Sequence, residues 1–271
     1  MSKSILITGA SKGFGFELAK RMLEDGNKVF CAARSLEKMQ ALKDLGATVI
    51  YLDANDPKSV EECAKQVLQE GGVDILVNNA GFGLYGPVET VPPEAAREQM
   101  EVNLFAPARL AQLLLPDMRK RGEGRIINIS SVAGRVYSPM SAWYCASKFS
   151  LEGLSDCLRV ELKPFNIKVV LIEPGPAKTD WPAGAKSSLL KYSQGTAYEN
   201  FGEKSLKLLN TATDGALASE PEEVVEKIIK AIYAKNPKAR YLCGKMTRLS
   251  VLSKSLLGNR LFDKVMLSQL K

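Results

Sequence analysis

The sequence of 271 residues contains no histidine. This absence excludes a Ser-His-Asp triad, whose general base is an imidazole, and a zinc site built from histidine and cysteine. The five cysteines, at positions 31, 63, 145, 157 and 243, include no Cys-x-x-Cys pair. An odd, scattered set is typical of reduced thiols, so we expect a cytoplasmic protein without a bound metal.

Long apolar runs are also missing. No uncharged apolar stretch reaches the ~20 residues that a membrane span needs, and residues 1–4 lead into a strand-like run rather than a signal peptide. Lysine and arginine outnumber aspartate and glutamate by 37 to 30, but the basic residues are dispersed along the chain. Because no nucleic-acid-reading motif accompanies this charge, we do not expect nucleic acid as a partner.

Short apolar runs alternate with stretches of helical periodicity from the N-terminus onward. The apolar runs are residues 5–7, 29–33, 48–52, 75–77, 125–129, 168–172 and 240–243. Such alternation is typical of a parallel sheet with helices on both faces. We therefore predict an α/β fold, a doubly wound Rossmann-type sheet of about seven strands in a single domain.

Two boundaries follow from changes in this pattern. We expect a catalytic domain over 1–245 and an amphipathic helical tail over 246–271. Within the domain, residues 176–218 are rich in serine, glycine, alanine and threonine and lack clear periodicity. They are predicted to form a long substrate loop, because a loop of this length in a compact domain is usually functional.

A glycine-rich segment follows the first apolar run. Residues 8–15 read Thr-Gly-Ala-Ser-Lys-Gly-Phe-Gly, and glycines permit a tight turn and close approach to a phosphate. The alternative is a plain glycine-rich turn, but the position between a strand and a helix favours an anion held at a helix N-terminus. Residues 78–81, Asn-Asn-Ala-Gly, end the fourth strand and face the same crevice if the sheet is doubly wound.

Tyr144 and Lys148 are four residues apart on a predicted helix and therefore share one face. A neighbouring ammonium lowers the pKa of a phenol, so we expect Tyr144 to act as a general acid or base. Ser131 follows the fifth strand and is placed to hydrogen-bond the substrate oxygen, and Asn103 to hold a water near Lys148. The alternative is an ordinary half-exposed helix surface.

These motifs together resemble the short-chain dehydrogenase/reductase family. They occur in family order within residues 4–180: the segments 8–15 and 78–81, Asn103, Ser130-Ser131, the segment 144–148, and Pro174-Gly175 followed by Thr179. The resemblance implies a catalytic tetrad of Asn103, Ser131, Tyr144 and Lys148. Ser131 is chosen over Ser130 because it lies thirteen positions before Tyr144, the usual family interval.

The second strand ends in Ala33-Arg34, without the acidic residue that binds the ribose 2′-hydroxyl of NAD. Arg34 and Lys12 are suited to a 2′-phosphate, so we predict NADP(H); the alternative is that both are solvated cations. Asp53 resembles the family's adenine-contacting acid, or is a turn residue. The predicted cofactor-binding residues are Gly9, Ser11, Lys12, Gly13, Phe14, Gly15, Arg34, Asp53, Asn79, Ala80, Gly81, Tyr144, Lys148, Pro174, Gly175 and Thr179.

The segment 144–174 resembles the steroid and retinol dehydrogenase branch of the family. We therefore expect interconversion of a carbonyl and an alcohol on a bulky apolar small molecule, in a pocket lined by Tyr85, Val132, Trp143, Trp181 and Tyr192. The alternatives are a 3-oxoacyl, small-ketone or sugar reductase and, in a different class, a non-catalytic NADP(H)-sensing regulator.

The tail carries leucines at roughly helical spacing with lysines and arginines between them. We expect it to cover the substrate pocket or to pack on a partner subunit, in preference to lying on a membrane surface. The family resemblance also suggests a homo-oligomer, a dimer or a tetramer.

Overall fold

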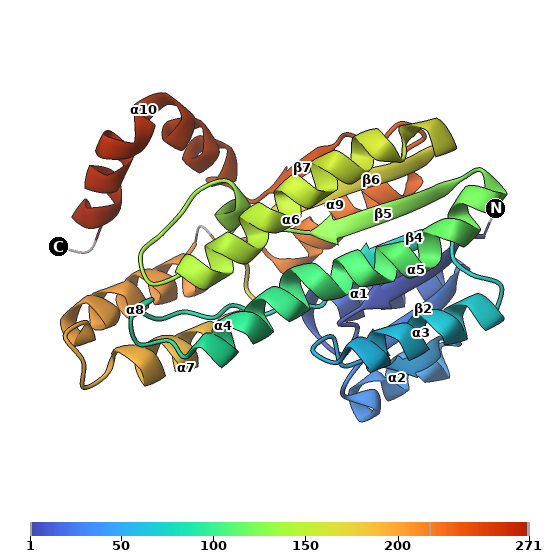
Figure 1. Ribbon diagram of the computed structural model, residues 1–271, viewed down its shortest axis with the longest axis horizontal. Helices are drawn as coiled ribbons and strands as arrows, with labels where there is room; N and C mark the ends of the chain where they lie inside the picture. Colours follow the sequence, from blue (N-terminus) through green and yellow to red (C-terminus); the bar gives the residue numbers. More distant parts are fainter. Residues whose placement is uncertain (1, 217, 270–271) are drawn as a thin grey trace.

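The computed structural model describes residues 2–216 and 218–269 and confirms the doubly wound Rossmann-type fold (Figure 1). In this part of the chain, seven parallel strands form one sheet in the order β3-β2-β1-β4-β5-β6-β7. The strands are β1 (Ser4–Thr8), β2 (Lys28–Ala33), β3 (Thr48–Tyr51), β4 (Ile75–Asn78), β5 (Gly124–Ile129), β6 (Ile167–Pro174) and β7 (Arg240–Cys243).

The described residues also form ten α-helices. They are α1 (Gly13–Glu24), α2 (Gln40–Asp44), α3 (Pro57–Gln69), α4 (Pro93–Met100), α5 (Ala106–Arg121), α6 (Ala142–Glu161), α7 (Trp181–Ser193), α8 (Glu199–Asp214), α9 (Pro221–Tyr233) and α10 (Thr247–Ser268). Short 3₁₀ turns are η1 (Leu36–Met39), η3 (Val132–Gly134) and η4 (Lys163–Phe165). Of the described helices, none has the length and apolarity to cross a bilayer.

Both faces of the sheet are buried, which explains the near-continuous apolar strands. Successive side chains of a strand point to opposite faces. In β1, Ile5 and Ile7 pack with α1 and α9, whereas Leu6 packs with α3 and α5. The order of the strands reverses between β1 and β4, so the carboxyl ends of these strands flank the crevice where such sheets bind ligands.

The long helix expected to carry Asn103 is continuous but irregular. Its middle, η2 (Glu101–Phe105), is a π-helical segment between α4 and α5. Single π turns inside α-helices are frequent at functional sites, because they redirect side chains and free backbone groups from the regular ladder.

The prediction that residues 176–218 form a loop is wrong for most of the segment. It contains α7 and α8, and Leu217 lies outside the described residues. Small residues such as Gly184 and Ala185 of α7 dilute the apolar stripe that helical periodicity needs.

The tail is helical as expected, although Lys271 and its neighbour at 270 lie outside the described residues. Gly258, with φ of +65° and ψ of 177°, breaks α10 into two parts. Figure 1 shows α7, α8 and α10 gathered at one end of the molecule, beyond the carboxyl ends of the strands. They therefore wall the same end of the sheet as the glycine-rich segment.

Candidate active site

The glycine-rich segment makes a turn that needs glycine at two positions. Gly9 has φ of +68°, and a Cβ placed on it would lie 2.9 Å from the Ala80 Cα. A Cβ on Gly15 would lie 2.5 Å from both the Asn79 Nδ2 and the Gly9 carbonyl oxygen. Gly13, which begins α1, has open space where a Cβ would be. The turn is therefore packed tightly against Asn79 and Ala80 on one side. It is open at the N-terminus of α1, where an anion would bind.

Two side chains hold this turn to the end of β4. The Thr8 hydroxyl accepts hydrogen bonds from the backbone N–H groups of Asn79 (3.0 Å) and Ala80 (2.9 Å). The Asn79 amide donates to the carbonyl oxygens of Thr8 (2.9 Å) and Gly9 (3.3 Å). Asn79 thus shapes the cradle, and Thr8 is a positioning residue that the sequence motif contained but our assignment missed.

A single cavity of about 1250 Å³ runs from this cradle past Tyr144 to α8 and α10. Ligand pockets usually measure about 300–1,000 Å³, so this one has room for a dinucleotide and a second molecule. The predicted cofactor residues that line it are Gly9, Ser11, Lys12, Gly13, Phe14, Arg34, Asp53, Asn79, Ala80, Gly81, Tyr144, Lys148, Pro174, Gly175 and Thr179. Gly15 does not line it and serves the packing of the turn instead.

Three exposed cations stand at the wall of the cavity near the end of β2: Lys12, Arg34 and Lys38. Within residues 2–216 and 218–269, no carboxylate lies within ion-pair distance of any of them. Lys38 was not predicted, because it lies in η1, five residues beyond the end of β2. Asp53 accepts a hydrogen bond from the Asn55 N–H (3.0 Å), as a turn residue does; it also lines the cavity, and its contact with adenine stays a prediction.

Tyr144 of α6 is buried, and the Ser131 side chain lies close enough to its hydroxyl to influence the pKa of the phenol. Ser131 is itself fixed, because its hydroxyl accepts from the Ala133 N–H (3.1 Å) and donates to the Pro174 carbonyl (3.4 Å). Burial is the largest influence on the phenol and raises the pKa of Tyr144, and the nearby Ser131 side chain opposes this rise. The phenol therefore carries its proton at neutral pH.

Lys148 lies beside Tyr144, but its ammonium binds a backbone carbonyl at the end of β5. Its Nζ donates to the Ile129 carbonyl (2.8 Å) and lies 6.0 Å from the Tyr144 ring centroid. Burial lowers the pKa of Lys148 to about 8, against an opposing effect of Glu152. The predicted lowering of the Tyr144 pKa is wrong for this arrangement, because desolvation of the buried phenol outweighs the effect of an ammonium 6.0 Å from the ring centroid.

Asn103, in η2, is almost fully buried and does not line the cavity. Its Oδ1 accepts from the Phe82 N–H (3.1 Å), and its Nδ2 donates to the Phe82 carbonyl (3.0 Å) and to the Ser147 hydroxyl (3.1 Å). The side chain therefore ties the loop after β4 to α6, which keeps Tyr144 and the cradle in register. That it also holds a water stays a prediction.

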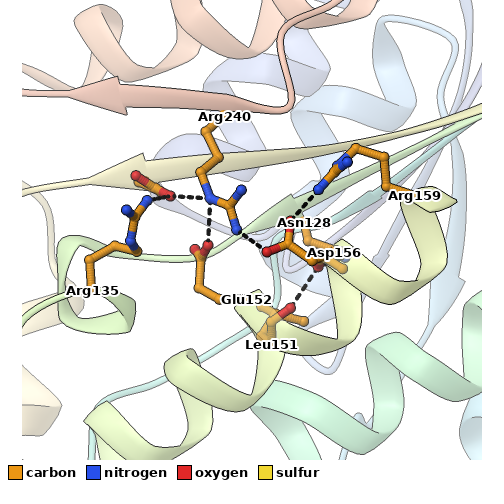
Figure 2. A network of polar contacts seen from close by, with 9 residues as sticks. Asn128, Arg135, Leu151, Glu152, Asp156, Arg159 and Arg240 are labelled. Atoms are coloured by element: carbon orange, nitrogen blue, oxygen red, sulfur yellow. Dashed lines mark hydrogen bonds and ion pairs between the residues drawn. The ribbon is translucent and has the colours of Figure 1, made fainter.

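Glu152, one turn beyond Lys148 on α6, belongs to a partly buried network of charges (Figure 2). The Arg240 Nε lies 3.0 Å from Glu152 and 3.0 Å from Glu173, and another of its nitrogens donates to Asp156 (2.6 Å). Arg135 also reaches Glu173 (3.2 Å). Burial raises the pKa of Glu152, Glu173 adds to the rise, and the nearby Ser130 and Arg240 side chains oppose it.

The predicted substrate residues divide into two groups. Tyr85, Val132 and Trp181 line the cavity, and the Tyr144 ring centroid lies 6.0 Å from that of Tyr85 and 5.1 Å from that of Trp181. Trp143 and Tyr192 do not line it, so their assignment is wrong. Trp143 directly precedes Tyr144 on α6, so its side chain points about 100° away from that of Tyr144 around the helix axis. Tyr192 packs beside Gly86.

Beyond Tyr144 the cavity is mainly apolar. Its far walls come from α8 and α10, with side chains at Leu208, Leu209, Ala212, Met246, Leu249, Leu257, Phe262, Val265 and Met266. The cavity therefore joins an open, cationic end to an apolar end, with the Tyr144 hydroxyl between them.

Comparison with known proteins identifies the family. A family profile described as short chain dehydrogenase matches residues 3–189. The chain is 35% identical to the NADPH-dependent 3-dehydrocapnine reductase of Ornithobacterium rhinotracheale, over 98% of this chain and 96% of that one. It is 35% identical to the human 17-beta-hydroxysteroid dehydrogenase type 1, over 88% of this chain and 76% of that one.

Solved structures agree. A short-chain dehydrogenase from Streptomyces avermitilis superposes with a TM-score of 0.81 at 30% identity, over 98% of this chain and 94% of that one. Other similar structures hold NADP or NADH, so the family fixes a nicotinamide dinucleotide without fixing the 2′-phosphate. The fold, the sequence match and these relatives together establish that the chain is an oxidoreductase of the short-chain dehydrogenase/reductase family, which acts on alcohol and carbonyl groups.

Proposed function

We propose that this protein is an NADP(H)-dependent reductase of a bulky apolar carbonyl compound, with Tyr144 as the proton donor. The observation that carries the proposal is that Tyr144 and Ser131 line one cavity together, between its cationic and its apolar ends. The nicotinamide supplies the hydride when it is bound. The chain supplies orientation, a dry site and a proton.

The cradle fits a dinucleotide. The turn at residues 9–13 leaves the N-terminus of α1 open to the cavity, and Gly13 leaves space where a side chain would block a phosphate. Unpaired N–H groups and the positive end of the helix dipole favour an anion at this place. Gly81 and Gly175 line the cavity further along, on the path to Tyr144.

The choice of NADP(H) over NAD(H) rests on charge. Lys12, Arg34 and Lys38 converge on the part of the cavity beyond β2, where an adenosine 2′-phosphate would add two negative charges. Guanidinium groups bind phosphate through two parallel hydrogen bonds. The NADPH dependence of the relative from Ornithobacterium rhinotracheale supports the same choice.

The roles of the tetrad follow from the contacts. The phenol of Tyr144 gives its proton to the oxygen of the carbonyl as that oxygen gains negative charge, and Ser131 donates a second hydrogen bond to the same oxygen. The Lys148 ammonium stabilises the resulting phenolate. Asn103 acts through others, since it positions Phe82 and Ser147.

The substrate class follows from the far walls. Leucine, valine, methionine and aromatic side chains line the end of the cavity beyond Tyr144, so an apolar body of steroid or long-chain size gains most from burial there. A steroid dehydrogenase among the relatives supports an apolar substrate. A polyol or sugar would find fewer hydrogen-bond partners there than it has hydroxyls, because the polar groups on these walls are few and scattered, such as Ser205 and Ser250.

The decisive experiment is the oxidation of NADPH at 340 nm with ketosteroids, retinal, long-chain ketones, short ketones and 3-oxoacyl thioesters. We expect the largest kcat/KM with the apolar ketones. Activity confined to the short ketones would refute the substrate class. A dinucleotide that binds without any turnover would instead identify a sensor protein.

The Tyr144→Phe variant tests the mechanism. Loss of a general acid lowers rates by roughly 100- to 10,000-fold, while the affinity for NADPH should change little because the phenol ring remains. Tyr85→Phe is the matched control, since that hydroxyl lies in the same aromatic cluster and has no assigned chemical step. If the Phe variant at 144 keeps normal kcat, the assignment of the proton donor fails.

A further inference from the structure

The apolar residues of α10 lie on more than one side of the helix. Some line the cavity, as described above. Others do not line it and remain exposed: Leu252 (54%), Leu256 (75%), Leu261 (52%) and Leu267 (52%). A helix whose polar and apolar residues are not separated onto two faces is normally covered on both sides. The inner side of α10 lines the cavity. The outer leucines need a second apolar environment.

The helix is fixed to the body at two places. Thr247, in the first turn, is buried beside Gly175. Further along, the buried Phe262 packs edge to face on Tyr137, with the ring centroids 5.1 Å apart. The Tyr137 hydroxyl donates a hydrogen bond to Asp263 (2.6 Å). Between these contacts α10 bends at Gly258, and Figure 1 shows it reaching away from the sheet. A long stretch of α10 therefore bridges the cavity with its outer side exposed.

The charges beside the outer leucines have one sign. Arg248, Arg260 and Lys264 are exposed, and no carboxylate in the described part of the chain forms an ion pair with them. Lys254 lies over the Tyr137 ring (4.9 Å). The acid on the helix, Asp263, is held by Tyr137. Exposed leucines between unpaired cations match the interface of a bilayer that carries anionic headgroups.

We propose that α10 lies on an anionic lipid surface and that the apolar substrate passes from this surface into the cavity between α8 and α10. The membrane contact stands on α10 by itself, whereas the passage of substrate rests on the proposed function. Leu208, Leu209 and Ala212 of α8 face the inner residues of α10 across the cavity. An apolar molecule leaving the lipid would therefore stay in contact with apolar side chains until its carbonyl reaches Tyr144.

Flotation of the full chain with vesicles tests the contact. We compare vesicles of phosphatidylcholine with vesicles of phosphatidylcholine and phosphatidylglycerol in a 3:1 ratio. The wild type should float with the anionic vesicles and lose this binding in high salt. Replacing Arg248, Arg260 and Lys264 together by glutamine should weaken binding on the order of 100-fold. The Leu256→Gln/Leu261→Gln variant should weaken it at least tenfold.

A variant with the same loss of charge elsewhere is the control. Lys43, Lys58 and Lys230 are exposed on α2, α3 and α9, so their replacement by glutamine should leave flotation close to that of the wild type. All variants are also assayed with a short soluble ketone, whose reduction the α10 variants should retain. With a long-chain ketone dissolved in the vesicles, the same α10 variants should react more slowly.

Three results would overturn the proposal. One is a wild type that stays unbound on anionic vesicles, and another is equal flotation of the α10 and control variants. The third is a change from oligomer to smaller species in Leu256→Gln/Leu261→Gln, because a second copy of the chain would then be the cover of these leucines. Absence of reductase activity with every carbonyl would refute the proposed function and leave the flotation result unaffected.

Discussion

Replacing Glu152 by glutamine should change the pH dependence of carbonyl reduction more than its maximal rate. Glu152 lies one turn beyond Lys148 on α6, and its charge raises the pKa of Lys148 against the effect of burial. Two unit charges about 6 Å apart interact by roughly 3 kcal/mol at an effective dielectric constant of 20. Because burial and Glu173 keep Glu152 partly protonated near neutral pH, we expect about half of this effect.

The sign of the change follows from the role of the ammonium. Reduction needs Lys148 protonated to stabilise the phenolate of Tyr144, so the rate falls as the pH rises through the Lys148 pKa of about 8. Removal of the negative charge lowers this pKa, and the descending limb of the kcat profile should move down by about one pH unit. The variant should match the wild type near pH 6 and be about fivefold slower near pH 8.

Steady-state kcat measured between pH 5.5 and 9.5 at saturating NADPH checks this expectation. Asp156→Asn is the control, because Asp156 binds the same Arg240 but lies a turn farther from Lys148 (Figure 2). Glu152→Asp keeps a carboxylate near Lys148, so the descending limb of its kcat profile should lie between those of the wild type and of Glu152→Gln. Superimposed profiles, or a loss of rate that is equal at every pH, would show that Glu152 is only structural and that our reasoning is wrong.

Three further substitutions test the cofactor end. Arg34→Gln should raise the KM for NADPH about tenfold and leave that for NADH nearly unchanged, as measured by initial rates, because only the 2′-phosphate contact is lost. Gly15→Ala should lower the free energy of unfolding by about 1–3 kcal/mol in urea titrations, since its Cβ would meet the Asn79 amide at 2.5 Å; Gly184→Ala, in open space within a helix, should raise it slightly. Thr8→Val should lower the melting temperature and the affinity for NADPH together, because two N–H groups at the end of β4 lose their acceptor. An unchanged melting temperature would refute the last assignment.

The sheet and the motif residues were predictable because both are local in the sequence. Strands buried on both faces leave apolar runs such as 5–7 and 75–77, and the turn after β1 leaves its glycines in one short segment. Tyr144 and Lys148 share a face because they are four residues apart, and the structure places both at the cavity. Trp143 was wrong by the same geometry, since a neighbour on a helix cannot share that face.

The features that the sequence did not predict depend on contacts between distant segments. Arg240 meets Glu152 across 88 positions of the chain, and no local pattern indicates which of the acidic residues will be buried with it. Lys38 reaches the cavity only because η1 follows β2 closely. The helix α7 was missed because small residues such as Gly184 and Ala185 weaken its apolar periodicity. Packing against the body, which stabilises such helices, cannot be read from a single segment.

One physical property connects the site with its proposed substrate. Burial raises the pKa of Tyr144 and lowers that of Lys148, so the exclusion of water is the largest influence on the pKa of both groups. The phenol is thereby kept protonated and ready to act as an acid, which favours reduction. The ammonium is kept close to its titration point, where a charge such as that of Glu152 has the largest effect on the rate. An apolar substrate enclosed by α8 and α10 would keep bulk water away from the reacting carbonyl, whereas a polar one would bring water with it. Proton transfer from Tyr144 and the apolar lining of the cavity therefore both favour an apolar substrate.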